Sequence, residues 1–168
     1  MYMIRPDNKA YVHSSLTMSV FLAGTIDNGA AEPWAHLVAD EFASDDIVFF
    51  NPRRENWLPD IEKRAHNPIF REQVEWELFH IETAHIVFFN FLTDSLSPIT
   101  LQELGYAIAR GSRMVVVCPD GFWRKGNVEI MCERFNIPVY GSLDEGIAAL
   151  RALIKEMTAF SFEGTNDL

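Results

Sequence analysis

Short apolar runs alternate along the chain with longer segments in which apolar residues recur at every third or fourth position. The runs are continuously apolar, which is typical of strands that are buried on both faces of a parallel sheet. The longer segments have the period of amphipathic helices. The pattern predicts strands at 19–23, 47–50, 85–91, 114–118 and 138–140. It predicts helices at 33–44, 70–81, 98–111, 128–135 and 143–157.

The regular alternation of strands and helices predicts one α/β domain, and 168 residues are enough for a core of ordinary size. We expect a single-domain, doubly wound, flavodoxin-like fold, in which about five parallel strands in the order 2-1-3-4-5 are flanked by helices. Residues 1–17 are expected to form a polar leader, 18–158 the domain and 159–168 a C-terminal tail.

The helix predicted at 70–81 carries more apolar residues than one contact with a sheet requires. Its expected sheet-facing stripe, spaced by three and four positions, is Phe70, Val74, Leu78 and Ile81. Trp76 and Phe79 widen the apolar surface beyond that stripe. This surplus predicts a subunit interface.

In the predicted strand order the switch point lies between the first and third strands, and open α/β sheets bind their ligands at that place. The loops at 24–27 and 93–97 are therefore expected to form opposite walls of one crevice. Glu103, in the second turn of the helix at 98–111, is expected to open onto this crevice. A carboxylate at this place is either a catalytic group or a solvated residue that interacts with the helix dipole.

The formal net charge of −10 opposes binding to long nucleic acid, which requires clustered Lys and Arg. A small molecule or a protein is the expected partner. No apolar run approaches the ~20 residues that span a bilayer, and the first residues lack the features of a secretory or transit sequence. We therefore expect no membrane association and a cytoplasmic location.

Neither the cysteines nor the histidines have the spacing of a metal site. Cys118 and Cys132 have no CxxC partner and lie in apolar contexts, so they are expected to be buried free thiols. The five histidines show no pair typical of zinc ligands. We expect no metal.

Two other protein classes with this fold fit less well. Receiver domains need an acidic pair after the first strand and a lysine after a later one, and this chain has neither. Flavodoxins need a Ser/Thr-rich phosphate nest, whereas the loop at 24–27 reads Gly-Thr-Ile-Asp. The function must therefore be argued from the site.

Five sequence blocks, between about Val20 and Tyr140, together resemble the nucleoside 2-deoxyribosyltransferase-like family. The blocks are 21–27, Asn51-Pro52-Arg53-Arg54 with Trp57, 70–77, 97–105 and 118–127. The resemblance implies that Glu103, in the Glu-Leu-Gly motif, attacks the anomeric carbon of a deoxynucleoside and expels the base. A second base then takes the sugar from the glycosyl-enzyme, and the configuration is retained. The implied substrates are deoxynucleosides and nucleobases, and no cofactor is needed.

The resemblance also assigns roles to two other side chains. Glu77 matches the family acid that contacts the sugar or the base, although the family usually has Asp there. Asn127 matches an asparagine that reaches the 5′-hydroxyl end of the substrate in a neighbouring subunit, which implies a homodimer or a higher homo-oligomer. The structural alternatives are a solvated helix glutamate for Glu77 and an N-cap for Asn127.

The remaining expected substrate contacts lie in the crevice loops and after the second strand. They are Gly24, Thr25, Asp27, Asn51 and Asp94.

The chain departs from the family pattern at two positions. Ser97 stands where family transferases often carry an Asp that protonates or holds the base, a role that Asp94 could take over. Val20 replaces a tyrosine that orients the nucleophile in some transferases.

Three functions remain open at this point. Ser97 is similar to the serine that helps bind phosphate in related deoxynucleoside 5′-monophosphate N-glycosidases, and it also suits a simple N-cap. Arg53, Arg54, Arg124 and Lys125 are cationic residues that could bind such a phosphate. The alternatives to transfer are therefore hydrolysis of the monophosphate or a non-catalytic nucleotide-sensing module.

Overall fold

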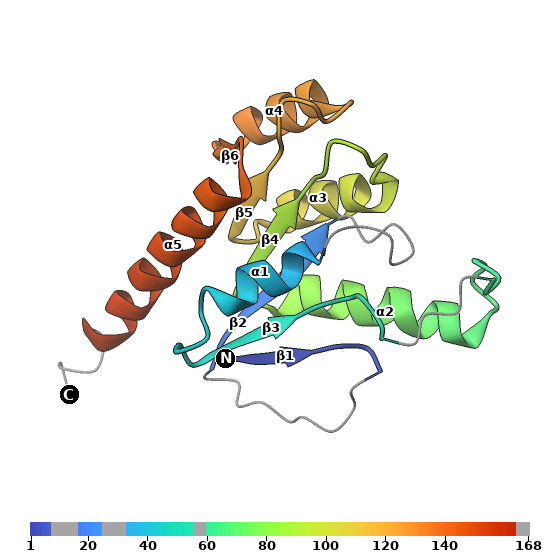
Figure 1. Cartoon of the computed structure of the whole chain (residues 1–168), viewed down its shortest axis with the longest axis horizontal. Helices are drawn as coiled ribbons and strands as arrows, with labels where there is room; N and C mark the ends of the chain where they lie inside the picture. The colour runs from blue at the N-terminus through green and yellow to red at the C-terminus, as the bar shows by residue number, and fades with distance from the viewer. Residues whose placement is uncertain (8–16, 25–32, 56–59, 164–168) are drawn as a thin grey trace.

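The computed structural model describes residues 1–7, 17–24, 33–55 and 60–163, with side chains described up to 159. The described strands are β1 (Tyr2–Ile4), β2 (Met18–Gly24), β3 (Ile47–Phe50), β4 (Ile86–Asn90), β5 (Met114–Val117) and β6 (Val139–Tyr140). The described helices are α1 (Trp34–Asp40), α2 (Pro68–Thr83), α3 (Pro98–Arg110), α4 (Lys125–Arg134) and α5 (Leu143–Glu163). Figure 1 shows this arrangement.

The described strands form one parallel sheet of six strands in the order β1-β3-β2-β4-β5-β6. Strands β2 to β6 have the order predicted for five strands, and the flavodoxin-like α/β fold is confirmed. The sixth strand, β1, lies at the edge, inside the segment that was expected to be a polar leader. Its three residues are too few to show a period, so the pattern of the sequence could not reveal it.

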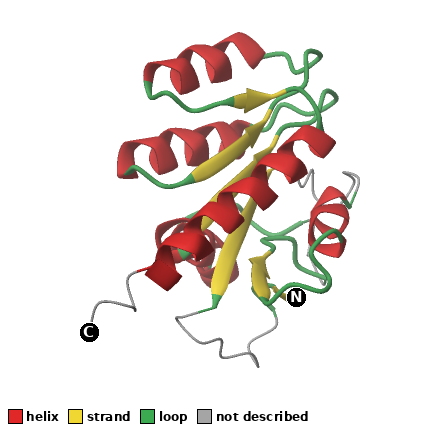
Figure 2. Cartoon of the chain, turned by 90° about the vertical axis from the view of Figure 1, so that its left-hand side faces the viewer, coloured by secondary structure: helices red, strands yellow, loops and turns green. Residues whose placement is uncertain are grey.

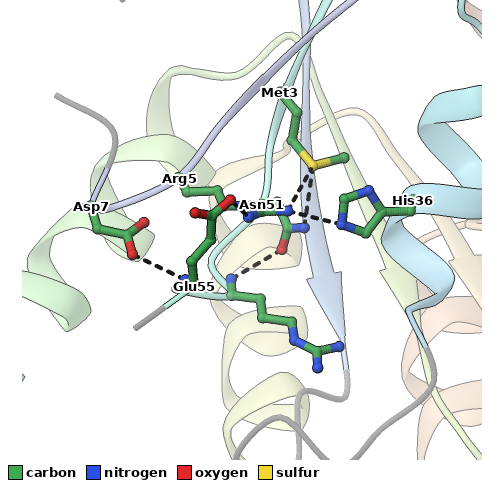
Figure 3. Close-up of polar contacts among 7 residues, drawn as sticks. Met3, Arg5, Asp7, His36, Asn51 and Glu55 are labelled. Carbon is green, nitrogen blue, oxygen red and sulfur yellow. Dashed lines mark hydrogen bonds and ion pairs between the residues drawn. The ribbon is translucent and has the colours of Figure 1, made fainter. Parts of the chain in front are cut away.

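Side-chain contacts fasten β1 to the neighbouring elements (Figure 3). The Met3 sulfur accepts hydrogen bonds from Asn51 Nδ2 at 3.5 Å and from Arg5 Nη2 at 3.9 Å. Arg5 also forms an ion pair with Glu55, and its Nη2 lies 2.8 Å from His36 Nε2 on α1. The edge strand is therefore tied to the segment that leaves β3 at its carboxyl end.

Helices cover both faces of the sheet (Figures 1 and 2). One core cluster contains residues of α2, α3 and α4, and the other contains residues of α1 and α5. Successive residues of β2 and β4 enter the two clusters in turn, because adjacent side chains in a strand point to opposite faces. The sheet is thus buried on both sides, as the continuous apolar runs predict.

Helix α2 turns a different face to the sheet than its apolar spacing predicts. Ile81 is buried as predicted, but Leu78 is 38% exposed, and Phe79, which lies outside the predicted stripe, is 56% exposed. The buried positions are instead Gln73, His80 and Ile81. The prediction for Leu78 is wrong because Gln73 forms hydrogen bonds with polar partners after β3, and the ring of His80 lies 4.0 Å from the ring of Phe50, at a tilt.

The two cysteines are free and buried in the core cluster of α2, α3 and α4, as predicted. Burial raises the pKa of Cys118 and of Cys132 to about 11. Neither thiol is therefore ionised to a useful extent at neutral pH. Within the described residues, no helix is both long and apolar enough to cross a membrane.

Gly24 ends β2 at a place with no room for a side chain. A Cβ atom there would lie 2.5 Å from the Trp34 ring and 2.6 Å from the backbone oxygen of Asn90. We predict that Gly24→Ala lowers the free energy of unfolding by about 1–3 kcal/mol, because the backbone of β4 cannot move aside. Thermal denaturation measures this. Gly105→Ala is the matched control, since its Cβ would meet nothing within 4 Å, and it should leave stability unchanged or raise it.

Candidate active site

Two carboxylates from adjacent helices lie close together beside the sheet. Glu103 is on α3, which follows the carboxyl end of β4, and Glu77 is on α2. Both side chains are partly or largely shielded from solvent. The charge of Glu77 acts directly on Glu103, so the two groups titrate as an interacting pair.

The pair binds protons more tightly than isolated carboxylates do. Burial raises the pKa of Glu103 well above its usual range, and the nearby charge of Glu77 raises it further. Burial also raises the pKa of Glu77 to about 7, although a hydrogen bond from Gln73 and the charge of Arg54 oppose the rise. Near neutral pH these shifts favour a state in which the pair retains one shared proton.

A glutamine connects Glu77 to the segment that follows β3. Gln73 Nε2 donates to Glu77 Oε1 at 2.7 Å and to the carbonyl oxygen of Pro52 at 2.8 Å. Gln73 Oε1 accepts from Arg54 Nε at 2.6 Å. Arg54 Nη2 is buried without a hydrogen-bond partner, and it lies 3.9 Å from a carboxylate oxygen of Glu72.

The loop between β4 and α3 holds a strained residue. Ser97, the N-cap residue of α3, has φ 44° and ψ 47°. Its hydroxyl donates to Ser95 Oγ at 3.0 Å and makes no capping hydrogen bond to the helix. Ser97 thus occupies the predicted N-cap position without capping through its side chain. Backbone strain of this kind is common at functional sites.

The loop between β5 and α4 contacts the loop that contains Ser97. The Trp123 indole N–H donates to the carbonyl oxygen of Leu96 at 3.1 Å, and the guanidinium of Arg124 lies 4.3 Å from the centre of the Trp123 ring. Farther in, the rings of Phe91 and Phe122 lie 4.8 Å apart. The start of α3, which carries Glu103, is therefore held from the side of β5.

We predict that Trp123→Phe loosens the start of α3 while the core stays intact. The phenyl ring keeps most of the packing but lacks the N–H that Leu96 receives, and one such hydrogen bond contributes about 1 kcal/mol. Amide hydrogen exchange over residues 96–101 should accelerate about fivefold, since local opening follows that free energy. The amides of α5 are the internal reference, and equal acceleration there would contradict the local role.

The structure describes some of the other predicted residues and not others. Asp94 is exposed in the loop before α3, and Asn127 is exposed in the first turn of α4. The N-cap of α4 is Arg124, so the structural alternative for Asn127, an N-cap of this helix, is wrong. The reason is that α4 begins earlier in the sequence than predicted. Thr25 and Asp27 lie outside the described residues.

Asn51 is engaged at the edge of the sheet. Its Oδ1 accepts from the backbone N–H of Arg53 at 3.0 Å, and its Nδ2 donates to the sulfur of Met3 (Figure 3). The buried side chain therefore shapes the turn that leads to Arg54.

Sequence reasoning missed the place of Gln73 beside Glu77, and it did not single out Asn90, a buried polar residue at the carboxyl end of β4. One signal for Gln73 was available: Gln73 and Glu77 are four residues apart, on one face of a helix. The stronger apolar spacing on another face concealed it. No cluster of three or more His, Cys, Asp or Glu side chains suited to a metal ion occurs in the described part of the chain.

A family model described as nucleoside 2-deoxyribosyltransferase like matches residues 17–122, which is more than half of the chain. The match includes both carboxylates and the segment that supplies Arg54. No curated protein shows a significant match to the chain. The extent of the family match and the α/β fold agree: the chain belongs to the nucleoside 2-deoxyribosyltransferase-like family.

Proposed function

We propose that the protein is a nucleoside 2-deoxyribosyltransferase, which moves 2-deoxyribose between nucleobases through a covalent intermediate on Glu103. The observation that carries the proposal is the partly buried pair of Glu103 and Glu77, whose pKa values are both raised, within a chain of this family. Retaining glycosyl transfer uses two carboxyl groups, one as nucleophile and one as acid and base.

In the first half-reaction, Glu103 is ionised and the shared proton lies on Glu77. A carboxylate oxygen of Glu103 bonds to C1′ of the sugar while the bond between C1′ and the base nitrogen breaks. The bonding electrons stay on the base, which takes the proton from Glu77. The products are a glycosyl ester on Glu103 and the free base.

In the second half-reaction, a ring nitrogen of the incoming base attacks C1′ from the face that the first base left. The ester bond from C1′ to Glu103 breaks, and Glu103 leaves as a carboxylate. The proton of the incoming base returns to Glu77. Two inversions retain the configuration of the sugar.

We propose further that the active form is a homodimer or a higher homo-oligomer in which Asn127 contacts the substrate of the neighbouring subunit. Helices α2 and α4 support this proposal, because each exposes large apolar side chains. The exposed fractions are 56% for Phe79 and 69% for Ile130. Asn127 is exposed on α4, the helix that also carries Ile130.

A second candidate function is hydrolysis of deoxynucleoside 5′-monophosphates. Ser95 and Ser97 favour it, because their hydroxyls are buried together at the start of α3, where backbone N–H groups suit a phosphate. The two reactions differ in the acceptor, which is a base in one and water in the other.

Chromatography of reaction mixtures distinguishes these functions. The protein is incubated with thymidine and adenine, with thymidine alone, and with thymidine monophosphate alone, and each mixture is repeated with Glu103→Ala. Deoxyadenosine that forms only with the wild-type protein supports transfer. Free thymine from the monophosphate without exchange supports hydrolysis. No reaction across a wider panel of bases would overturn both and favour a nucleotide-sensing module.

A further inference from the structure

The amide of Gln73 can adopt only one orientation. Arg54 Nε is a donor without acceptor capacity, so the atom 2.6 Å from it must be the amide oxygen. The carbonyl of Pro52 is only an acceptor, so the atom 2.8 Å from it must be the amide nitrogen. An amide flip would break both contacts. Gln73 is also buried, so bulk solvent does not readily replace these partners.

Because of this fixed orientation, Gln73 can only donate a hydrogen bond to Glu77. Gln73 presents an N–H to Glu77 Oε1 at 2.7 Å, and it cannot turn its oxygen toward that carboxyl group. An ionised carboxylate accepts such a hydrogen bond more strongly than a protonated one. Gln73 therefore favours the ionised form of Glu77 over the protonated form.

Glu103 differs from Glu77 in its surroundings. The influences resolved on Glu103 are burial and the charge of Glu77, and both oppose its ionisation. Glu77 faces the charge of Arg54 from the segment after β3 and the carboxyl of Glu103 from α3. On its own helix it has Gln73, and His80 one turn further on, whose Nδ1 lies 2.7 Å from the carbonyl oxygen of Trp76.

We propose that Gln73 is a positioning residue, which acts through Glu77 and determines on which of the two carboxyl groups the shared proton lies before substrate binds. In the free protein the proton lies on Glu103, and the ionised Glu77 is held by Gln73. Substrate binding must then move the proton from Glu103 to Glu77. Glu103 is therefore ionised, and able to act as the nucleophile, only when a substrate is present. The chemical use of this proton rests on the proposed function, whereas the role of Gln73 toward Glu77 does not.

The test is a titration of the side-chain carboxyl carbons by ¹³C NMR, on glutamate-labelled protein without substrate. The spectra of Glu77→Gln and Glu103→Gln assign the two resonances. In Gln73→Leu the titration midpoint of Glu77 should rise by about one pH unit, since a hydrogen bond to an ionised group is lost. Gln73→Glu should shift it in the same direction and by more, because it keeps an acceptor for Arg54 but lacks the N–H, and its own carboxylate disfavours the ionised form of Glu77.

Two further variants serve as an alternative in case of misfolding and as a control. Gln73→Glu keeps the test possible if the apolar replacement does not fold, and Gln102→Leu, on the exposed side of α3, is the matched control and should leave the midpoint of Glu77 unchanged. A midpoint of Glu77 that stays at the wild-type value in a folded Gln73 variant overturns the inference. The readout needs no turnover, so an inactive protein whose Glu77 midpoint still rises would refute the proposed function and leave this inference standing.

Where base exchange is measurable, the pH dependence of kcat/KM gives an independent check. Activity requires at least one ionised carboxylate in the pair, so the acidic limb follows the more acidic group, Glu77. This limb should move to higher pH in both Gln73 variants. A lower rate with an unmoved limb would indicate a merely structural role and would contradict the inference.

Discussion

Glu103→Gln lowers the rate of base exchange at least about a thousandfold, because the amide cannot form the glycosyl ester on which both half-reactions depend. The substitution keeps the size of the side chain and removes a buried, readily protonated carboxyl group, so the protein should remain folded. Initial rates of deoxyadenosine formation from thymidine and adenine measure the effect.

Glu75→Gln is the control for that experiment. Glu75 lies on α2, and its side chain is 63% exposed and paired with Arg71 one turn away. Because exposed pairs of this kind contribute little, its rate should match that of the wild-type protein. If Glu103→Gln retained more than about a tenth of the activity, Glu103 would not be the nucleophile.

Glu77→Gln should lower the rate by about a hundred- to ten-thousandfold, which is the usual contribution of a general acid and base. The loss should depend on the leaving group. A 2-deoxyriboside of 4-nitrophenol needs no proton to depart, so its release from the sugar should be nearly as fast in the variant as in the wild-type protein. Equal losses for both substrates would show that Glu77 positions the sugar and does not transfer the proton.

The same substitution should change stability in a manner that depends on pH. The pKa of Glu77 is about 7 in the folded protein and about 4.5 in a model compound. A group with a raised folded pKa contributes stability that is complete below pH 4.5 and is lost as the pH rises through 7.

The full loss for Glu77 is on the order of 3 kcal/mol, and a glutamine there does not titrate. Relative to the wild-type protein, Glu77→Gln should therefore gain stability between pH 5 and pH 8. Thermal denaturation at these two pH values measures the gain. A difference between the two proteins that is independent of pH would show that Glu77 is not protonated in the way described.

The order of strands β2 to β6 could be predicted from the sequence because each is a continuous apolar run, and alternating helices impose parallel connections. The ends of α3 could also be predicted from the sequence. Pro98 begins this helix, and Gly111, with φ 71°, ends it in the left-handed conformation that glycine favours.

The edge strand β1 and the orientation of α2 could not be predicted from the sequence in this way. Strand β1 depends on tertiary partners such as Asn51, whose backbone N–H donates to the carbonyl of Ile4 at 2.9 Å. Helix α2 buries Gln73 and leaves Leu78 partly exposed, whereas the apolar spacing predicts that Leu78 faces the sheet. Burial of a polar face requires partners from another segment, and a helical pattern contains no information about them.

The candidate site could be predicted in part. Glu103 was found from its place after a buried strand, and Glu77 entered through the family resemblance. The pairing of their charges depends on how α2 and α3 pack. The link from Arg54 through Gln73 to Glu77 joins residues up to 23 positions apart in the sequence, and only the fold brings them together.

The central claim is that Glu103 carries the sugar between the two half-reactions, and mass spectrometry tests it most directly. The protein is mixed with thymidine in the absence of an acceptor base, quenched with acid and digested. The account predicts one deoxyribosyl group on the peptide that contains Glu103, which disappears when adenine is added before the quench. Base exchange without such an adduct, or an adduct on another residue, would contradict it.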